Sequence, residues 1–578
     1  METVSHNADF CVVGGGLAGL CAAVSAARHG ARTVLMHERP VLGGNASSEI
    51  RMWVCGAHGR NMRETGLIEE IRLANLHRNP AGCWSIWDSV LYEKARFEPN
   101  LTLLLNCSCA GAEMAGRRLK SVRGWQMTTQ SWQSVSAACF ADCSGDSILA
   151  PLAGAEFRMG REGRGEFGED IAPPEADRRT MGMSCLMQLR EMRRPVEFVP
   201  PGWAYVFKTD GDLQNRCHDI HGEMGNNFWW IEVGGEGDSI RDTEQCRDEL
   251  LRIAFGVWDH IKNRGEHGAE NWALDWLGFL PGKRESRRYV GDHILTQNDV
   301  RAGGRFHDIV AYGGWTMDDH HPSGFWHRGE PTIYHSAPSP FGIPYRSLYS
   351  RNVENLFCAG RNISATHSAL SSTRVMATCA TLGQAVGTAA ALAVKGGLTP
   401  RDVYEERLAE LQDELQDDDC YLPGRRRRVS RASLDAGLFA AAGEPGPLRN
   451  GWDRPVGDDG NAWEAPCGSA VTLEFGRLLN GGEARLVFDS DLADNSPYMP
   501  CAYALDAGLS ALPAGLVKAY RLEALREGGR PEIIMEESRN IRRLARVPLP
   551  GAFRAVTLTP LSTWGGGGMA RVFAFEVK

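Results

Sequence analysis

Three glycines near the start of the chain have the spacing of a nucleotide-binding turn. Gly14, Gly16 and Gly19 follow a short apolar segment, residues 10–13, and open an Ala-rich segment of helical character. In a G-x-G-x-x-G turn the first glycine permits a tight bend, the second lets backbone approach a pyrophosphate, and the third lets helix pack on strand. The helix N-terminus then faces the phosphates with free N–H groups. The spacing therefore predicts a dinucleotide site.

An acidic residue after the next apolar segment fits the same site. Glu38 follows this segment and lies roughly twenty residues beyond the glycines, where an acid that binds a ribose 2′-hydroxyl is expected. Its charge argues against a ribose 2′-phosphate. Arg39, Gly44 and Asn45 come shortly afterwards, and we expect them to contact the same cofactor.

Two later segments indicate which dinucleotide is bound. Both begin with apolar, strand-like residues and turn at a glycine, with Asp142, Gly145 and Asp146 in the first and Gly360 and Arg361 in the second. Together with the Gly43-Gly44 pair, they resemble, in the same order, the segments that hold the cofactor in the glutathione-reductase-like class of FAD enzymes. The resemblance implies FAD as the cofactor.

A helix rich in small residues is predicted after the last of these turns, beginning near Ser371 or Ser372. Its alanines and glycines permit close packing against another backbone or a flat ring, and its N-terminus suits the negative charge of a reduced flavin. The alternative is a tightly packed core helix. Arg374 has three open roles: a contact to the cofactor pyrophosphate, a contact to the substrate, or a salt bridge.

Four strings of the sequence carry a wider resemblance: GGNASSEIRMWVCGAH from Gly43, PGKRESRR from Pro281, GGWTMDDH from Gly313 and RNISATH from Arg361. With them, most of residues 8–420 resembles a family of FAD-dependent oxidoreductases found among bacterial carbohydrate-utilisation enzymes. The resemblance implies a flavin oxidoreductase and leaves its substrate open.

Oxidation of an alcohol or amine needs a base for the released proton, and imidazole titrates near neutral pH. His367 is the first candidate, because it lies between the Gly360 turn and the small-residue helix; a structural histidine at that turn is the alternative. His320 is the next candidate. Arg287 is expected either to hold a substrate or to form an interior ion pair. We predict no metal site, since adjacent residues such as His320 and His321 rarely supply two ligands from one strand.

The leading hypothesis is an FAD-dependent oxidoreductase that oxidises an alcohol carbon of a sugar-like or polyhydroxylated small molecule by hydride transfer to flavin N5. A flavin-dependent reductase of an activated C=C bond, with an arginine as proton donor, is one alternative. A flavin-stabilised, glycan-binding scaffold without turnover is the other.

The elements that position these residues predict an α/β fold with a further all-β domain. We expect a split, Rossmann-like FAD-binding domain in residues 1–160 and 341–423, the latter ending in a polar helix. A large substrate or cap domain, residues 161–340, is inserted between its two parts. Short alternating segments in residues 424–578 predict a β-sandwich, similar to discoidin and galactose-binding modules.

Charge and composition argue against several kinds of partner. A net charge of −9 over 578 residues leaves no basic stripe for nucleic acid, and the basic run 425–428 is predicted to be a solvated linker. No long uninterrupted apolar run predicts a membrane span. The 16 cysteines form no C-x-x-C pair, and we expect a reducing, cytoplasmic location. A small molecule, with carbohydrate as one candidate class, is the expected partner, and the oligomeric state is open.

Overall fold

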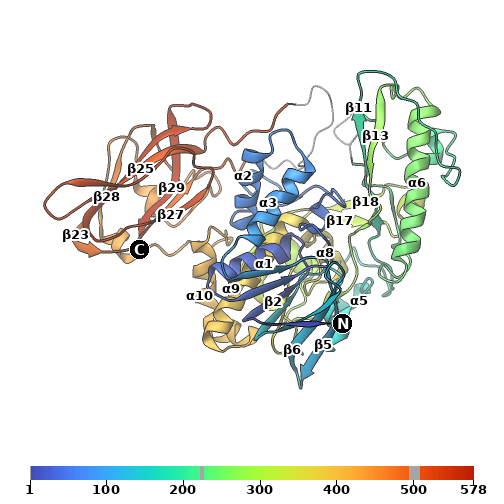
Figure 1. Cartoon of the computed structure of the whole chain (residues 1–578), viewed down its shortest axis with the longest axis horizontal. Helices are drawn as coiled ribbons and strands as arrows, with labels where there is room; N and C mark the ends of the chain where they lie inside the picture. The colour runs from blue at the N-terminus through green and yellow to red at the C-terminus, as the bar shows by residue number, and fades with distance from the viewer. Residues whose placement is uncertain (1, 222–226, 494–507) are drawn as a thin grey trace. The chain divides into compact units, whose positions relative to one another are not determined.

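The computed structural model describes residues 2–221, 227–493 and 508–578 (Figure 1). Contacts divide the chain into two compact units. Of the described residues, the first contains those within 2–57 and 81–411 together with 508–509, and the second contains 58–80, 412–493 and 510–578. Each unit is therefore assembled from segments that are far apart in the sequence, and residues 58–80 belong with the C-terminal part of the chain.

A five-stranded parallel sheet is the centre of the first unit. Its order is β20-β8-β2-β3-β4, and every neighbouring pair is parallel. Most of its residues are apolar and buried, as expected for a parallel sheet covered on both faces. The strands are β2 (Phe10–Val13), β3 (Thr33–Met36), β4 (Leu101–Leu104), β8 (Cys139–Asp142) and β20 (Leu356–Cys358).

Two helices of small residues pack closely together beside this sheet, α1 (Leu17–Arg28) and α9 (Met376–Gly396). A Cβ at Gly383 would lie 2.0 Å from the Ala18 carbonyl oxygen, and one at Gly387 would lie 2.2 Å from that of Ala22. Only glycine permits this approach. By length and composition α9 could also span a membrane, but 94% of its most apolar window is buried inside the fold, as in a core helix.

The helix predicted from Ser371 or Ser372 is in fact two helices. A short helix, α8 (His367–Thr373), ends at Arg374, and α9 begins after Val375, whose backbone is extended. Small-residue composition alone carries no signal for this break. Arg374 consequently lies at a junction between two helices.

The first unit also contains a mixed sheet in the order β1-β7-β6-β5, in which β1 and β7 are parallel and the other neighbouring pairs are antiparallel. Its strands are β1 (Thr3–Asn7), β5 (Cys107–Ala115), β6 (Arg118–Gln126) and β7 (Ser131–Ser136). The same unit contains α3 (Trp84–Arg96), α4 (Leu149–Ala153), which contacts β5, α5 (Arg164–Phe167) and α7 (Gln297–Arg301).

The inserted segment is built from small sheets and one long helix, α6 (Thr243–Asn263). Many of its aromatic residues form one buried core, which includes Phe207, Phe228, Trp230, Trp258, Trp272 and Phe325. One small sheet has the order β12 (Glu232–Val233), β10 (Met183–Ser184), β14 (Gly282–Lys283). Two further pairs are β11 (Met187–Glu191) with β13 (Trp272–Leu277), and β17 (Met317–His320) with β18 (Thr332–His335). At the borders of the segment, β9 (Phe157–Arg158) pairs with β15 (Arg288–Tyr289), and β16 (Ile309–Gly313) pairs with β19 (Phe341–Pro344).

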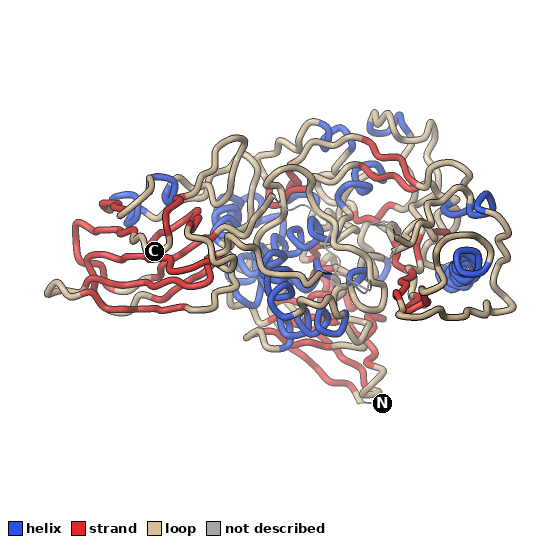
Figure 2. Tube along the Cα trace, turned by 90° about the horizontal axis from the view of Figure 1, so that it is seen from above, coloured by secondary structure: helices blue, strands red, loops and turns tan. Residues whose placement is uncertain are grey.

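The second unit is an antiparallel sandwich, whose strands are red in Figure 2. One sheet contains β21 (Gly437–Ala440), β23 (Val471–Asn480), β28 (Ala552–Thr563), β25 (Val517–Leu525) and β26 (Pro531–Glu537), and the other contains β22 (Trp463–Pro466), β29 (Met569–Val577), β24 (Glu483–Phe488) and β27 (Leu544–Pro548). The unit also holds α2 (Leu67–Arg78) and α11 (Arg431–Asp435), while α10 (Pro400–Asp417) crosses the division between the units. The predicted fold class, α/β with an all-β sandwich, is confirmed.

The basic run at 425–428 is not simply a solvated linker, so that prediction is wrong for one of its members. Arg427 is buried and pairs with Asp453 at 3.0 Å and with Glu576. Burial acts to raise the pKa of Asp453, but Arg485 and Arg427 lower it to about 2. A basic run in the sequence gives no sign that one member has carboxylate partners far along the chain.

Candidate active site

A cavity of about 320 Å³ lies in the first unit, at the carboxyl ends of the parallel strands, where α/β sheets bind ligands. One end is formed by the glycine turn after β2. The other end is formed by residues of the inserted segment, including Trp229, Arg284 and His320. The cavity therefore joins the predicted cofactor site to the segment expected to supply the substrate walls.

The glycine turn is shaped by close backbone contacts. Gly14 has φ +105°, and a Cβ there would lie 2.4 Å from the Cys143 carbonyl carbon. A Cβ at Gly19 would lie 1.8 Å from the Gly14 carbonyl oxygen, so Gly19 serves helix packing and does not line the cavity. Gly16 is the N-cap of α1, which has no side-chain cap, and it lines the cavity. This helix N-terminus is free to receive an anion.

Glu38 lies beside this turn in the cavity wall and is about half exposed. Burial acts to raise the pKa of Glu38, but His37 and Arg39 outweigh it and lower that pKa to about 2. His37 in turn accepts a hydrogen bond from the Gly15 N–H at 2.9 Å. The carboxylate is thus ionised and available as an acceptor for a ribose hydroxyl, and Arg39 also lines the cavity.

The two later glycine turns meet the first one at the cavity. Gly145, Gly360 and Arg361 all line it. Asp146 does not line it; instead it holds Arg361 at 2.8 Å and Lys283 at 2.7 Å. A Cβ at Gly145 would lie 2.6 Å from Arg361 Nη1, so the guanidinium packs directly over this glycine.

Gly44 and Asn45 differ from Asp142 in their position relative to the cavity. Gly44 and Asn45 line it, and the Asn45 side-chain amide donates to the Lys283 carbonyl at 3.0 Å. Asp142 is fully buried outside the lining and accepts from Ser144 and from the Tyr289 hydroxyl at 2.7 Å. Its contacts order the β8 turn.

A second helix N-terminus faces the same cavity. Val375 is the N-cap of α9, which likewise has no side-chain cap, and Val375 and Met376 line the cavity. Arg374 lines it as well and donates to Asp318 Oδ2 at 3.0 Å. Of the three roles left open for Arg374, the structure contains the salt bridge.

At the end formed by the inserted segment, His320 lies between two carboxylates. Its Nδ1 is 2.7 Å from Glu232 Oε2, and its Nε2 is 3.4 Å from Asp318 Oδ2. Glu232 also pairs with Arg284 at 3.3 Å. His320, Asp318 and Arg284 line the cavity with Arg374, and each is largely buried.

Neighbouring cations keep both carboxylates ionised. Burial acts to raise the pKa of Glu232, but Arg284 and His320 lower it. Burial has the same effect at Asp318, where His320 and Arg374 hold the pKa well below its usual value. His320 therefore lies next to two stable negative charges.

Aromatic side chains complete this end of the cavity. Trp229, Trp315 and Tyr334 line it, and the Trp229 ring meets His320 edge to face with centroids 5.4 Å apart. Burial, with the charge of Asp318, raises the pKa of Tyr334 to about 12, so its hydroxyl stays protonated. Flat apolar faces and polar hydroxyl partners occur together here.

Comparison with known families decides which kind of site this is. The family model described as FAD dependent oxidoreductase matches residues 9–415, which is more than half of the chain. The chain belongs to the FAD-dependent oxidoreductase family. No curated protein matches the sequence.

Several solved structures resemble parts of this FAD-dependent oxidoreductase. A geranylgeranyl bacteriochlorophyll reductase-like protein from Thermoplasma acidophilum is 12% identical, covering 72% of this chain and 88% of that one, with a TM-score of 0.33. A family 32 carbohydrate-binding module from C. perfringens, solved with galactose, is 11% identical and covers 25% of this chain and 95% of that one, with a TM-score of 0.18. A module of the same family from Streptococcus pneumoniae is 11% identical and covers 26% and 99%, with a TM-score of 0.20.

The residues at the cavity fit the FAD that the family binds. Two uncapped helix N-termini, those of α1 and α9, face it and suit the diphosphate and the flavin ring edge. The Nε atoms of Arg361 and Arg374 are buried and lack a hydrogen-bond partner among the described residues. Glu38 is an ionised acceptor for a ribose. Each of these groups would find its complement in a bound dinucleotide.

His367 and Arg287, the other two candidate catalytic residues, do not line the cavity. His367 Nδ1 is 2.8 Å from Glu285 Oε2 and its Nε2 is 3.1 Å from Asp319 Oδ1. Burial acts to lower the pKa of His367, but these carboxylates raise it to about 10, so this ring is a cation at neutral pH and a poor base. Arg287 packs over the Phe157 ring at 5.3 Å.

Sequence reasoning missed Asp318, Glu232, Lys283 and Tyr334. Asp318 is next to a predicted candidate in the string GGWTMDDH, and period-two alternation in β17 would have placed it on the same face as His320. Glu232 gave no local signal, because its partner lies 88 positions away in the chain. Strand pairing across the inserted segment, which the sequence does not reveal, brings the two together.

Proposed function

We propose that this flavoenzyme oxidises an alcohol carbon of a sugar-like or polyhydroxylated small molecule, with His320 as the proton acceptor. The observation that carries the proposal is the position of His320 between Glu232 and Asp318 in the wall of the cofactor cavity. FAD, when bound, supplies the two-electron acceptor.

The partners of His320 define its proton chemistry. The Glu232 carboxylate is an acceptor only, so the 2.7 Å contact is a bond from the Nδ1–H of the imidazole. In a neutral ring the lone pair is then on Nε2, the atom 3.4 Å from Asp318 Oδ2. When Nε2 takes a hydroxyl proton, an imidazolium forms between two anions. The Glu232 and Asp318 carboxylates stabilise the positive charge as it develops. Glu232 thus acts as a positioning residue for the base.

The other groups at this end suit a polyhydroxylated ligand. Arg284 and Arg374 present fixed N–H donors, Asp318 is an acceptor, and Trp229 and Tyr334 offer ring faces. A sugar combines hydroxyls around its edge with apolar C–H faces, so it needs both kinds of partner. The inserted segment supplies nearly all of these residues.

Anaerobic stopped-flow mixing of the oxidised enzyme with a panel of glycosides and polyols tests the proposal. We expect at least one compound to bleach the flavin absorbance. His320→Gln should slow that bleaching by about 100-fold or more, as loss of a general base does, with flavin content unchanged. His321→Gln is the matched control, because His321 stacks on His327 outside the cavity lining. Absence of bleaching across the panel would refute alcohol oxidation.

One observation favours a second function, reduction of an activated C=C bond with an arginine as acid. Burial lowers the pKa of Arg284, and the charge of Arg374 lowers it further, although Glu232 opposes this. In that case unsaturated carboxylic acids should reoxidise the chemically reduced enzyme, and Arg284→Lys should slow reoxidation more than His320→Gln does. The reverse order of effects would eliminate this second candidate.

A further inference from the structure

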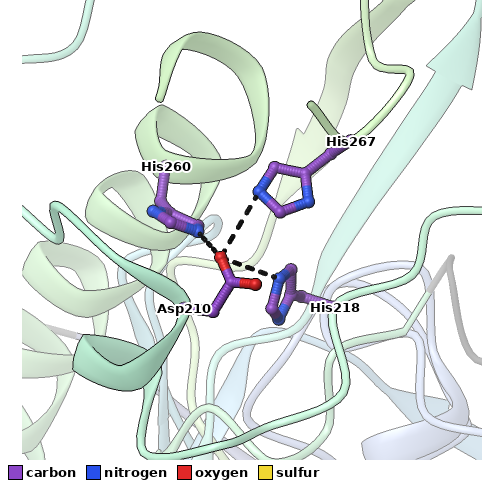
Figure 3. Close-up of side chains that lie close together, drawn as sticks. All are labelled: Asp210, His218, His260 and His267. Atoms are coloured by element: carbon purple, nitrogen blue, oxygen red, sulfur yellow. Dashed lines mark hydrogen bonds and ion pairs between the residues drawn. The ribbon is translucent and has the colours of Figure 1, made fainter. Parts of the chain in front are cut away.

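A cluster of three histidines and one aspartate lies in the inserted segment, outside the cavity lining (Figure 3). Asp210 begins a short 3-10 helix (Asp210–Leu213), His218 follows in the next loop, His260 is near the end of α6, and His267 lies between α6 and β13. Asp210 Oδ1 is 3.0 Å from His260 Nε2 and 3.8 Å from the Nε2 atoms of His218 and His267. All four ligand atoms lie within 4.8 Å of one another.

We propose that these four side chains bind one divalent transition-metal ion of the zinc class. Three imidazole nitrogens and one carboxylate oxygen form a donor set typical of Zn²⁺, whereas Mg²⁺ and Ca²⁺ prefer oxygen ligands. Bonds of about 2.0–2.1 Å in a tetrahedron place ligand atoms about 3.3 Å apart. The three separations from Asp210, 3.0, 3.8 and 3.8 Å, require shifts of only a few tenths of an ångström on either side of that value.

Backbone carbonyls hold two of the rings in the tautomer that a metal requires. His218 Nδ1 lies 2.8 Å from the Arg216 carbonyl oxygen, and His260 Nδ1 lies 3.1 Å from that of Phe207. A carbonyl only accepts, so each Nδ1 carries the proton and donates it. The Nε2 lone pair of each neutral ring then points at the cluster. Such carbonyl partners commonly orient metal-binding histidines.

The chain is also shaped to place His267. A Cβ at Gly265 would lie 2.2 Å from His267 Nε2, so a side chain at position 265 would displace that ring from its present position. Lys262 fixes the loop by donating to the carbonyls of Ala269, Glu270 and Trp272 at 2.6–2.8 Å. His267 Nε2 is nevertheless buried without a hydrogen-bond partner among the residues described. A buried ring nitrogen without a hydrogen-bond partner lacks the partner that a metal ion would provide.

The remaining ligand, Asp210, is held by its own turn and is open to solvent. Asp212 accepts from the backbone N–H groups of Lys208 and Thr209 at 2.7 and 2.9 Å, which fixes the turn that presents Asp210. The Asp210 side chain is 71% exposed, whereas that of His260 is 1% exposed. An ion can therefore enter past Asp210. With four protein ligands the site is closed, as in structural zinc sites, and it would fasten residues 210–218 to the end of α6.

The test uses the full-length flavoprotein, freed of metal with a chelator and titrated with Zn²⁺ against a chromophoric competitor. We expect one Zn²⁺ per chain and a higher melting temperature when it is bound. Asp210→Ala, His218→Ala and His267→Ala should each weaken binding by about 100-fold or more, exceeding the cost of losing an outer-sphere partner. Gly265→Ala should also weaken it. His221→Ala is the matched control, since His221 contacts Trp272 and is not in the cluster.

Cobalt gives an independent readout that does not depend on enzyme activity. Co²⁺ in a tetrahedral site has intense visible bands at longer wavelength than flavin absorption, and these bands should appear with the wild-type chain and disappear with His267→Ala. Absence of stoichiometric Zn²⁺ binding, weak octahedral cobalt bands, or wild-type affinity in both His218→Ala and His267→Ala would overturn the proposal.

Discussion

Replacing His367 tests whether this histidine has a structural or a catalytic role. The ring is 5% exposed and lies 2.8 Å from Glu285, whose side chain is fully buried, and 3.1 Å from Asp319. His367→Gln keeps much of the side-chain volume and removes the positive charge. Arg288 Nη1, 3.2 Å from Glu285, would remain as a partial substitute. We expect a less stable protein in which the flavin, where it is retained, is reduced at a normal rate.

The magnitude follows from the pKa of His367, about 10 in the fold against an ordinary 6.5. A raised pKa contributes stability that is fully present below pH 6.5 and is lost as the pH rises through 10. The linkage relation gives a contribution of about 4 kcal/mol at pH 7 and about 1 kcal/mol at pH 9.5. The pH 7 value agrees with the 3–5 kcal/mol typical of breaking one side of a buried ion pair.

Urea unfolding of the two proteins, followed by flavin release, measures this difference. The loss of free energy of unfolding caused by His367→Gln should shrink by about 3 kcal/mol between pH 7 and pH 9.5. An equal loss at both pH values would show that the imidazolium is not the source of the stability. A fully folded His367→Gln enzyme with slow flavin reduction would show that His367 acts in the chemistry, and our reasoning about its charge would be wrong.

Three further substitutions test the cofactor site and the second unit. Glu38→Gln should weaken FAD binding about tenfold, the low end of the 1.5–3 kcal/mol for a charged hydrogen bond, because Glu38 is 46% exposed; titration of apoprotein with FAD measures it, and an unchanged Kd contradicts it. Gly19→Ala places a methyl group 1.8 Å from the Gly14 carbonyl oxygen, so the purified protein should contain little flavin by absorbance, and full occupancy would refute this packing. Arg427→Ala should destabilise the second unit by about 3–5 kcal/mol in thermal unfolding with normal flavin content; an unchanged melting curve contradicts the buried pairs.

Much of the cofactor site could be predicted because its signals are local. Gly14, Gly16 and Gly19 sit where a strand becomes a helix, and their roles follow from backbone geometry over a few residues. Glu38 follows from the length of one βαβ unit. The strands that precede Gly145 and Gly360 are short and, apart from Asp142 at the end of β8, apolar, so the sequence also indicated their burial in a parallel sheet.

The substrate end could not be predicted as well, because its contacts are non-local. The sequence favoured His367 over His320 as the base, and the structure distinguishes them by their surroundings: His320 lies in the cavity wall, and His367 is enclosed by Glu285 and Asp319. The helix break at Arg374 likewise depends on tertiary turns. The histidine cluster spans positions 210 to 267 without a recognisable spacing, so nothing in the sequence pointed to it. The prediction of no metal site considered only the adjacent pair His320 and His321.

The charges around His320 favour alcohol oxidation over arginine-driven reduction. Arg284 and Arg374 balance Glu232 and Asp318, so the group is neutral when the imidazole is neutral. Both carboxylates have lowered pKa values and stay ionised, so two anions lie beside the His320 ring and stabilise an imidazolium there. Arg284 would have to lose a proton against the attraction of Glu232 3.3 Å away. In the proposed reaction, microscopic reversibility means that the imidazolium would also return the proton when a carbonyl is reduced, so His320 would serve both directions of an alcohol–carbonyl reaction.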